Sequence, residues 1–88
     1  MGIGRVMIKV LFFARLREQL GINELLLEPI SGETVLALAK RLRAQQSEEW
    51  DVLLDEETVY AMNQDIVERN TVVADGAEVA FFPPVTGG

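Results

Sequence analysis

A two-residue alternation of side-chain types predicts β-strands near both ends of the chain. Residues 7–13 (MIKVLFF) and 78–82 (EVAFF) are rich in strand formers. The first strand places Ile8, Val10 and Phe12 on one face and Lys9, Leu11 and Phe13 on the other. In the last strand Glu78 marks the solvent face, so Phe82 is predicted to be exposed and Phe81 to point into the core. Residues 24–28, 59–62 and 66–67 are predicted as shorter strands.

A helical period replaces this alternation in the middle of the chain. Thr34 is a plausible N-cap, and the apolar side chains that follow recur at the i, i+3, i+4, i+7 spacing of an amphipathic helix that ends around residues 45–47. These apolar side chains are Val35, Leu38, Ala39 and Leu42. Residues 15–20 are predicted as a polar loop ending at Gly21. Residues 48–57 are predicted as an acidic loop held by apolar anchors such as Trp50.

The resulting ββαββ order predicts an α+β fold: a twisted mixed sheet of four to five strands with one main helix packed on one face. This is the order of the β-grasp, or ubiquitin-like, fold. Resemblance to that fold implies that the first and last strands lie side by side and parallel at the centre. We expect a domain over residues 7–82, preceded by an extension of residues 1–6 and followed by a flexible reactive tail of residues 83–88.

Composition narrows the chemistry that the chain can perform. It contains no cysteine and no histidine among its 88 residues, which removes thiolate nucleophiles, imidazole bases and the usual zinc ligands. The acidic residues lack the spacing of a calcium loop, so no metal site is expected. A net charge of −6 disfavours nucleic acid and anionic membranes as partners and favours a protein with a basic groove. Without a long apolar run, we expect a cytoplasmic protein.

The last eight residues, FFPPVTGG, combine a strand, a stiff spacer and a terminus without side chains. Pro83 and Pro84 cannot continue a sheet and favour an extended chain. The residues from Pro83 to Gly88, including Val85 and Thr86, reach roughly 20 Å at full extension. Gly87 and Gly88 lack a Cβ, so they fit a narrow channel in another protein. A glycine terminus that merely frays is the alternative, but the Pro-Pro spacer after this strand order favours a reactive tail.

Apolar side chains are also expected at the base of this tail. If the first strand lies beside the last, Leu11 and Phe13 join Phe82 in one patch, and such patches usually mark partner surfaces. A covering loop that buries them is the alternative. Arg15 and Arg17 could pair with carboxylates of a partner, although exposed arginines usually have no specific partner, and Arg17 is included in the predicted interface.

The chain from Met7 onward resembles the small subunits of molybdopterin synthase, the MoaD-type sulfur carriers of the ubiquitin-like class. The resemblance covers nearly the whole chain and rests on MIKVLFFARLRE, the Thr34-Val35 helix start, the Met62-Asn63-Gln64 turn, Asp75-Gly76 and the ending VAFFPPVTGG. It implies that Gly88 is the reactive position and that Phe13, Ile66 and Phe82 lie in a subunit interface. The extension before Met7 departs from the family pattern.

The resemblance further implies how the tail is used. An adenylating enzyme related to the ubiquitin-activating class uses ATP and magnesium to activate Gly88, and a sulfur donor enzyme converts it to a thiocarboxylate. The tail then enters the large synthase subunit and gives its sulfur to cyclic pyranopterin monophosphate, which builds the dithiolene of molybdopterin. The chain itself is then a non-catalytic donor without a permanent cofactor, within a heterotetramer. A carrier for thiamine thiazole or another thiolation pathway, a ubiquitin-like protein modifier and a plain interaction domain are the alternatives.

Overall fold

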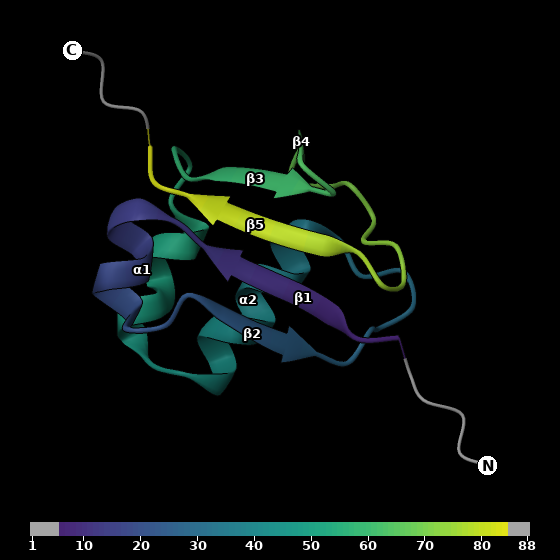
Figure 1. The fold of residues 1–88 in the computed structure, drawn as a ribbon, viewed down its shortest axis with the longest axis horizontal. Coiled ribbons are helices and arrows are strands. Elements are labelled where there is room, and N and C mark those ends of the chain that lie inside the picture. Colours follow the sequence, from purple (N-terminus) through teal and green to yellow (C-terminus); the bar gives the residue numbers. More distant parts are fainter. Residues whose placement is uncertain (1–5, 85–88) are drawn as a thin grey trace.

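A five-stranded mixed sheet organises the part of the chain that the computed structural model describes, residues 6–84 (Figure 1). Its strands are β1 (Ile8–Phe12), β2 (Glu24–Leu27), β3 (Val59–Met62), β4 (Asp65–Ile66) and β5 (Glu78–Phe82). Their order across the sheet is β2-β1-β5-β3-β4. β1 and β5 are parallel neighbours, whereas the other neighbouring pairs are antiparallel. The expected pairing of the first and last strands is confirmed.

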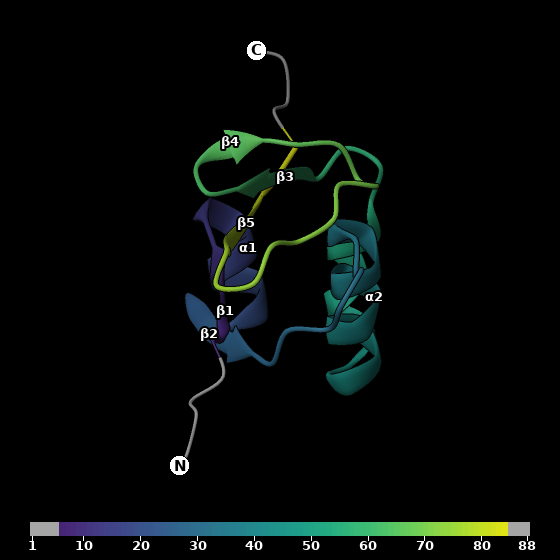
Figure 2. The same ribbon diagram turned by 90° about the vertical axis from the view of Figure 1, so that its right-hand side faces the viewer.

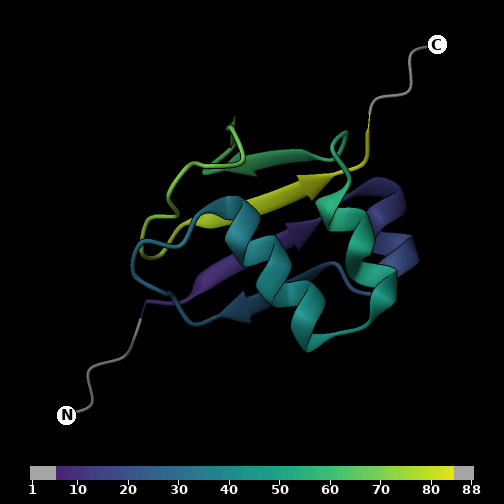
Figure 3. The same cartoon turned by 180° about the vertical axis from the view of Figure 1, so that it is seen from behind.

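The helices leave one face of the sheet open. They are α1 (Ala14–Leu20), α2 (Val35–Gln45) and the 3-10 helix η1 (Glu48–Leu54). Figure 2 shows the sheet nearly edge-on, with α2 on one side of it and no helix on the other. Figure 3, from behind, shows α2 and η1 lying across the covered face and α1 at its end. None of the helices within residues 6–84 is long and apolar enough to cross a membrane.

Helix α2 forms where the sequence predicts it. The backbone N–H of Ala37 donates to Thr34 Oγ1 at 3.1 Å, so Thr34 is the expected N-cap. The helix ends at Gln45, within the expected range. Its apolar stripe is fully buried against the sheet and comprises Val35, Leu38, Ala39 and Leu42. The helix therefore supplies one side of the core, as its spacing requires.

The other side of the core comes from the inward faces of β1, β3 and β5. The ring of Phe12 stacks on Phe81 with centroids 5.8 Å apart and meets Trp50 edge-on at 5.3 Å. Tyr60 meets Phe81 edge-on at 5.1 Å. Trp50 is thus a core anchor, as expected, and it ties η1 to the sheet.

The predicted loop over residues 15–20 is wrong, because this segment is helix α1. Leu16 and Leu20 are four residues apart, so one helical face turns both toward the core, and Leu16 is almost fully buried. Gly21 ends the helix in a left-handed conformation with φ 74°, and its N–H donates to the carbonyl of Arg17 at 2.9 Å. Phe13 precedes the helix without a side-chain cap, which removes the usual signal of a helix start.

The acidic segment is also more ordered than a loop. Residues Glu48–Leu54 form η1, in which Trp50 and Leu53 share the three-residue spacing of a 3-10 helix and are both buried. The carboxylates of this segment point to solvent because the apolar pair takes the inner side. The short strand expected at residues 66–67 begins one residue earlier, as β4.

Candidate functional site

One row of side chains crosses four strands on the open face of the sheet. Leu11 pairs with Ala80, Ala80 with Ala61, and Ala61 with Ile66 in the strand register. The two alanines occupy the middle of this row, and the larger side chains stand at its ends. Small residues between large ones leave a depression, because side chains stand roughly perpendicular to a sheet.

This depression is the floor of a hollow of about 630 Å³, called here the sheet groove. Its lining residues are Leu11, Phe13, Val59, Ala61, Gln64, Ile66, Glu78, Ala80, Phe82 and Pro83. Most of them are apolar, with Gln64 and Glu78 as the polar members. Ile66 is 79% exposed, although it carries one of the largest aliphatic side chains. Such an apolar concavity on an open sheet fits a partner's apolar side chains.

The hairpin between β3 and β4 positions Ile66 at the edge of the groove. Asn63 and Gln64 both have positive φ, 52° and 75°, as the central residues of a type I′ turn require. Asn63 Oδ1 accepts a hydrogen bond from the N–H of Glu78 at 3.0 Å, and the N–H of Asn63 donates to the carbonyl of Glu78 at 2.8 Å. The turn is therefore bound to the start of β5, which fixes β4 beside the groove.

Phe13 and Phe82 form an aromatic pair at the other end of the groove. Their rings are parallel within 5° and their centroids are 4.6 Å apart. The prediction that Phe82 is exposed is wrong, because this stacking leaves it half-buried. Phe13 remains 38% exposed. The pair is a flat apolar surface beside the point where the chain leaves β5.

The structure brings most of the predicted interface residues together. Leu11, Phe13, Ile66 and Phe82 all line the sheet groove. Arg17 does not: it lies exposed on α1 and contributes no side chain to the groove. The predicted interface omitted five further lining residues, Val59, Ala61, Gln64, Glu78 and Ala80. The alternation of β3 could have assigned Val59 and Ala61 to one face, but only strand pairing shows which residues they adjoin.

The groove borders the root of the tail. Pro83 lines it directly, and Pro83 and Pro84 are both half-buried. The other predicted tail positions, Val85, Thr86, Gly87 and the reactive Gly88, lie outside the described residues. Within residues 6–84, no group of three or more acidic, histidine or cysteine side chains is placed to hold a metal ion.

Comparison with known proteins shows which protein family this chain resembles. Residues 10–88 match the model of the ThiS family. The chain belongs to this family. The molybdopterin synthase sulfur carrier subunit of Escherichia coli K12 is 45% identical over 85 residues, with coverage of 93% of this chain and 100% of that protein. The resemblance seen in the sequence is therefore confirmed.

Solved structures similar to this ThiS-family chain agree on the fold. The crystal structure of SAMP1 from Haloferax volcanii superposes with a TM-score of 0.77 at 24% identity, covering 93% of this chain and 99% of that one. A complex of subunits 1 and 2 of the molybdopterin-converting factor from Helicobacter pylori contains a chain with a TM-score of 0.60 at 23% identity, with the same coverages. Together with the observed topology, they confirm the ubiquitin-like β-grasp.

Proposed function

We propose that this chain is the sulfur carrier subunit of a molybdopterin synthase. The observation that carries the proposal is the sheet groove, an apolar hollow that ends at Pro83, the root of the tail. A carrier needs a surface that binds its partner and a reactive end that reaches into that partner, and the groove adjoins the root of the segment that carries this end. The 45% identity to the Escherichia coli carrier supports the same assignment.

The large synthase subunit is the partner that we assign to the groove. Its apolar side chains would enter between Ile66 on one side and the Phe13–Phe82 pair on the other. Burying Ile66, which is 79% exposed in the free chain, would remove apolar surface from water and favour binding. The Helicobacter pylori complex of subunits 1 and 2 supports this partner class. By family resemblance we expect a heterotetramer with a carrier at each end of a dimer of large subunits.

The chemistry that we propose takes place at the carboxylate of Gly88 in three steps. In the active site of an adenylating enzyme, a carboxylate oxygen attacks the α-phosphorus of magnesium-bound ATP, and pyrophosphate leaves. Sulfur, supplied by a donor enzyme at the oxidation level of sulfide, then attacks the acyl carbon, and AMP leaves with one carboxylate oxygen. The resulting thiocarboxylate gives its sulfur to cyclic pyranopterin monophosphate, and water restores the carboxylate.

The composition of the chain supports a donor that depends on its partners for catalysis. It contains no histidine and no cysteine, so the usual general acids, bases and thiol nucleophiles are expected on the partners. A carboxylate is a poor electrophile because its charge is delocalised, which explains why ATP is needed. The dithiolene contains two sulfur atoms, so each molybdopterin requires two transfers.

Mass spectrometry of the intact chain tests the proposal. After incubation with ATP, magnesium, sulfide and an adenylating enzyme from its host, we expect a gain that matches replacement of one oxygen by sulfur, located at Gly88 by fragmentation. A chain lacking Gly88 is the matched control and should stay unchanged. Failure of the complete chain to gain sulfur with an active enzyme would refute the carrier chemistry.

A carrier for another thiolation pathway, such as thiamine thiazole synthesis, shares the first two steps and differs in the acceptor. Mixing the thiocarboxylate form with a large synthase subunit and cyclic pyranopterin monophosphate separates these functions. Release of the carboxylate form together with molybdopterin supports the synthase assignment. Sulfur retained with this partner but consumed by another acceptor enzyme supports the alternative. Lysine adducts that depend on Gly88 would instead indicate a protein modifier.

A further inference from the structure

The root of the tail lies between two hollows. Pro83 lines the sheet groove and also a smaller hollow of about 170 Å³, called here the root notch. The root notch is lined by Arg15, Leu16, Gln19, Val52, Asp55, Pro83 and Pro84. Its residues outside the tail come from α1, from η1 and from Asp55, which directly follows η1. The two prolines therefore form one wall of this notch and face residues of two helices at the point where β5 ends.

The corner between β1 and α1 joins these hollows. Phe13 stacks on Phe82 in the sheet groove, whereas Arg15 and Leu16 line the root notch. Ala14 lies between them with φ 54°, a left-handed conformation that is strained for a residue with a Cβ. The N–H of Phe13 donates to the carbonyl of Phe81 at 3.2 Å, so this corner is bound to the end of β5.

Helix η1 supplies the facing wall of the notch, and its end is held by a compact set of hydrogen bonds. The carbonyl of Val52 accepts from Thr58 Oγ1 at 2.7 Å and from the N–H of Asp55 at 3.2 Å. Asp55 Oδ1 accepts from the N–H of Glu57 at 2.9 Å. This wall therefore has little freedom to move away from the prolines.

We propose that α1 and η1, which face the prolines across the root notch, form a seat that holds Pro83 and Pro84 and sets the direction in which the reactive tail leaves the domain. Arg15, Gln19 and Val52 are its positioning residues. The inference rests on the proposed function and deepens it. Because Pro84 and Gly88 are four residues apart, the terminal carboxylate lies at most about 14 Å from the seat. Fixing the direction at the root raises the effective concentration of that carboxylate at one point in a docked enzyme.

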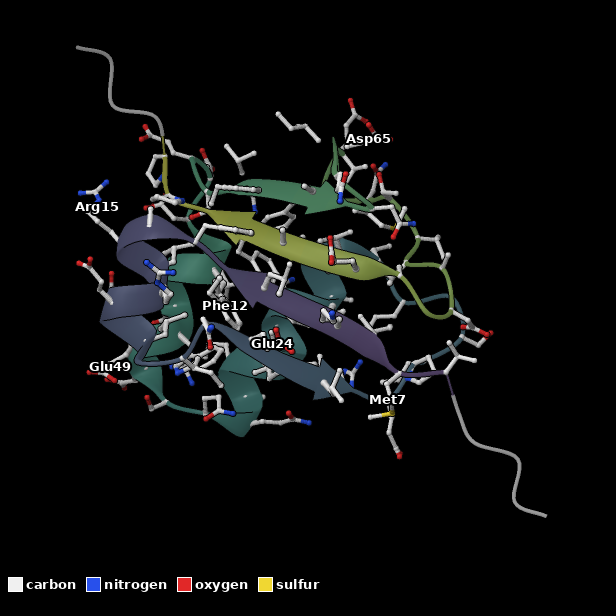
Figure 4. All side chains as sticks on the ribbon, in the orientation of Figure 1. Met7, Phe12, Arg15, Glu24, Glu49 and Asp65 are labelled. Carbon is white, nitrogen blue, oxygen red and sulfur yellow. The ribbon has the colours of Figure 1, made fainter. Side chains whose placement is uncertain are left out.

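The outer wall of the notch can be removed without touching the core. Arg15 and Gln19 are exposed on α1, and the side chain of Arg15 has no hydrogen bond or ion pair with any other residue in the 6–84 range. Figure 4 shows Arg15 projecting from the start of α1, at the end of the sheet where β5 stops. The double variant Arg15→Ala/Gln19→Ala should therefore fold normally. Glu18→Ala is the matched control, because Glu18 is exposed on the same helix and lines neither hollow.

Nuclear Overhauser contacts test the seat directly and do not depend on the proposed function. We expect contacts between the ring protons of Pro83 and Pro84 and the methyl groups of Leu16 and Val52 in the wild-type chain and in Glu18→Ala. In the double variant these contacts should weaken. Their absence from the wild-type chain, or equal strength in the double variant, overturns the proposal.

Kinetics of adenylation then separate positioning from binding. With pyrophosphate release as the readout, the double variant should lose about fivefold in kcat and keep its KM within about twofold, because only two exposed side chains of α1 are shortened and the rest of the surface is unchanged. Arg15→Met, which keeps the aliphatic stem and removes the charge, should retain the wild-type kcat. An unchanged kcat in the double variant, or a higher KM alone, overturns the proposal. A wild-type chain that is never adenylated refutes the proposed function instead, and the Overhauser contacts still decide the seat.

Discussion

Truncating Ile66 separates binding from folding more cleanly than any other change in the sheet groove. Ile66 is 79% exposed on the edge strand β4, so it contributes little to the folded domain. Exposed positions of this kind usually change the free energy of unfolding by less than about 0.5 kcal/mol when substituted. Ile66→Ala should therefore leave the urea midpoint nearly unchanged.

Binding to the large subunit should respond much more strongly. The substitution removes three carbon groups, each worth about 0.8 kcal/mol on full burial, or about 2.4 kcal/mol in total. Scaling by the 79% that is exposed in the free chain gives about 2 kcal/mol. This corresponds to a rise of about 25-fold in Kd, measured by isothermal titration calorimetry with the large subunit.

Leu26→Ala provides the matched control. Leu26 is 57% exposed on β2, at the opposite edge of the same sheet, and does not line the groove. It loses the same number of carbon atoms, so a general effect of surface hydrophobicity would appear in both variants. We expect its Kd to stay within about twofold of wild type. Equal weakening by both variants, or none by Ile66→Ala, would falsify the assignment of the groove as the binding surface.

Three further predictions concern stability. Thr34→Ala removes the acceptor for the N–H of Ala37 and should lower the free energy of unfolding in urea by about 1 kcal/mol. Burial raises the pKa of the Tyr60 hydroxyl above its ordinary value, and the nearby Arg69 opposes this rise only in part. In strongly alkaline solution the folded chain therefore keeps a proton on Tyr60 that the unfolded chain loses. The stability from this group is complete below about pH 10 and is lost as the pH rises further, and Tyr60→Phe should flatten that decline. Ala14→Gly should raise the free energy of unfolding by up to about 1 kcal/mol, since φ 54° suits glycine.

Each of these predictions has a control. Thr34→Ser keeps a hydroxyl acceptor, so a loss equal to that of Thr34→Ala would show that capping is not the cause. Tyr60 is the only tyrosine in the chain, and parallel pH profiles of wild type and Tyr60→Phe above pH 10 would contradict its role. Ala14→Val introduces a β-branched side chain at the left-handed position, and stability equal to that of Ala14→Gly would contradict backbone strain there.

The elements with long, regular patterns could be predicted from the sequence. In α2 the apolar spacing and the Thr34 cap agree, and the same residues are buried in the structure. The inward alternation of β1 and β5 predicted the burial of Phe12 and Phe81 in the same way. Local patterns suffice for these elements because the two faces of each element have clearly different environments, one in the core and the other outside it.

The elements that were missed depend on contacts that are distant in sequence. Helix α1 is too short for a periodic signal and begins at a strained residue, Ala14, without a capping side chain. In η1 the anchoring by Trp50 was predicted, but the many carboxylates concealed the 3-10 helix that buries Trp50 and Leu53 together against Phe12 and the rest of the core. The half-burial of Phe82 likewise depends on stacking with Phe13, which needs the strand register. Helix α1, helix η1 and the half-burial of Phe82 therefore all depend on tertiary contacts.

The parallel pairing of β1 and β5 explains why the candidate binding surface and the tail root coincide. In the register Lys9 lies beside Glu78 and Leu11 lies beside Ala80, and two residues further along the same face the rings of Phe13 and Phe82 stack on each other. The charged positions of both strands therefore fall at one end of the open face and the aromatic positions at the other. An antiparallel pair would place Phe82 beside the start of β1, next to Lys9, and would separate it from Phe13. Parallel pairing thus gathers the apolar surface where β5 ends, so a partner that docks there meets the tail at its root.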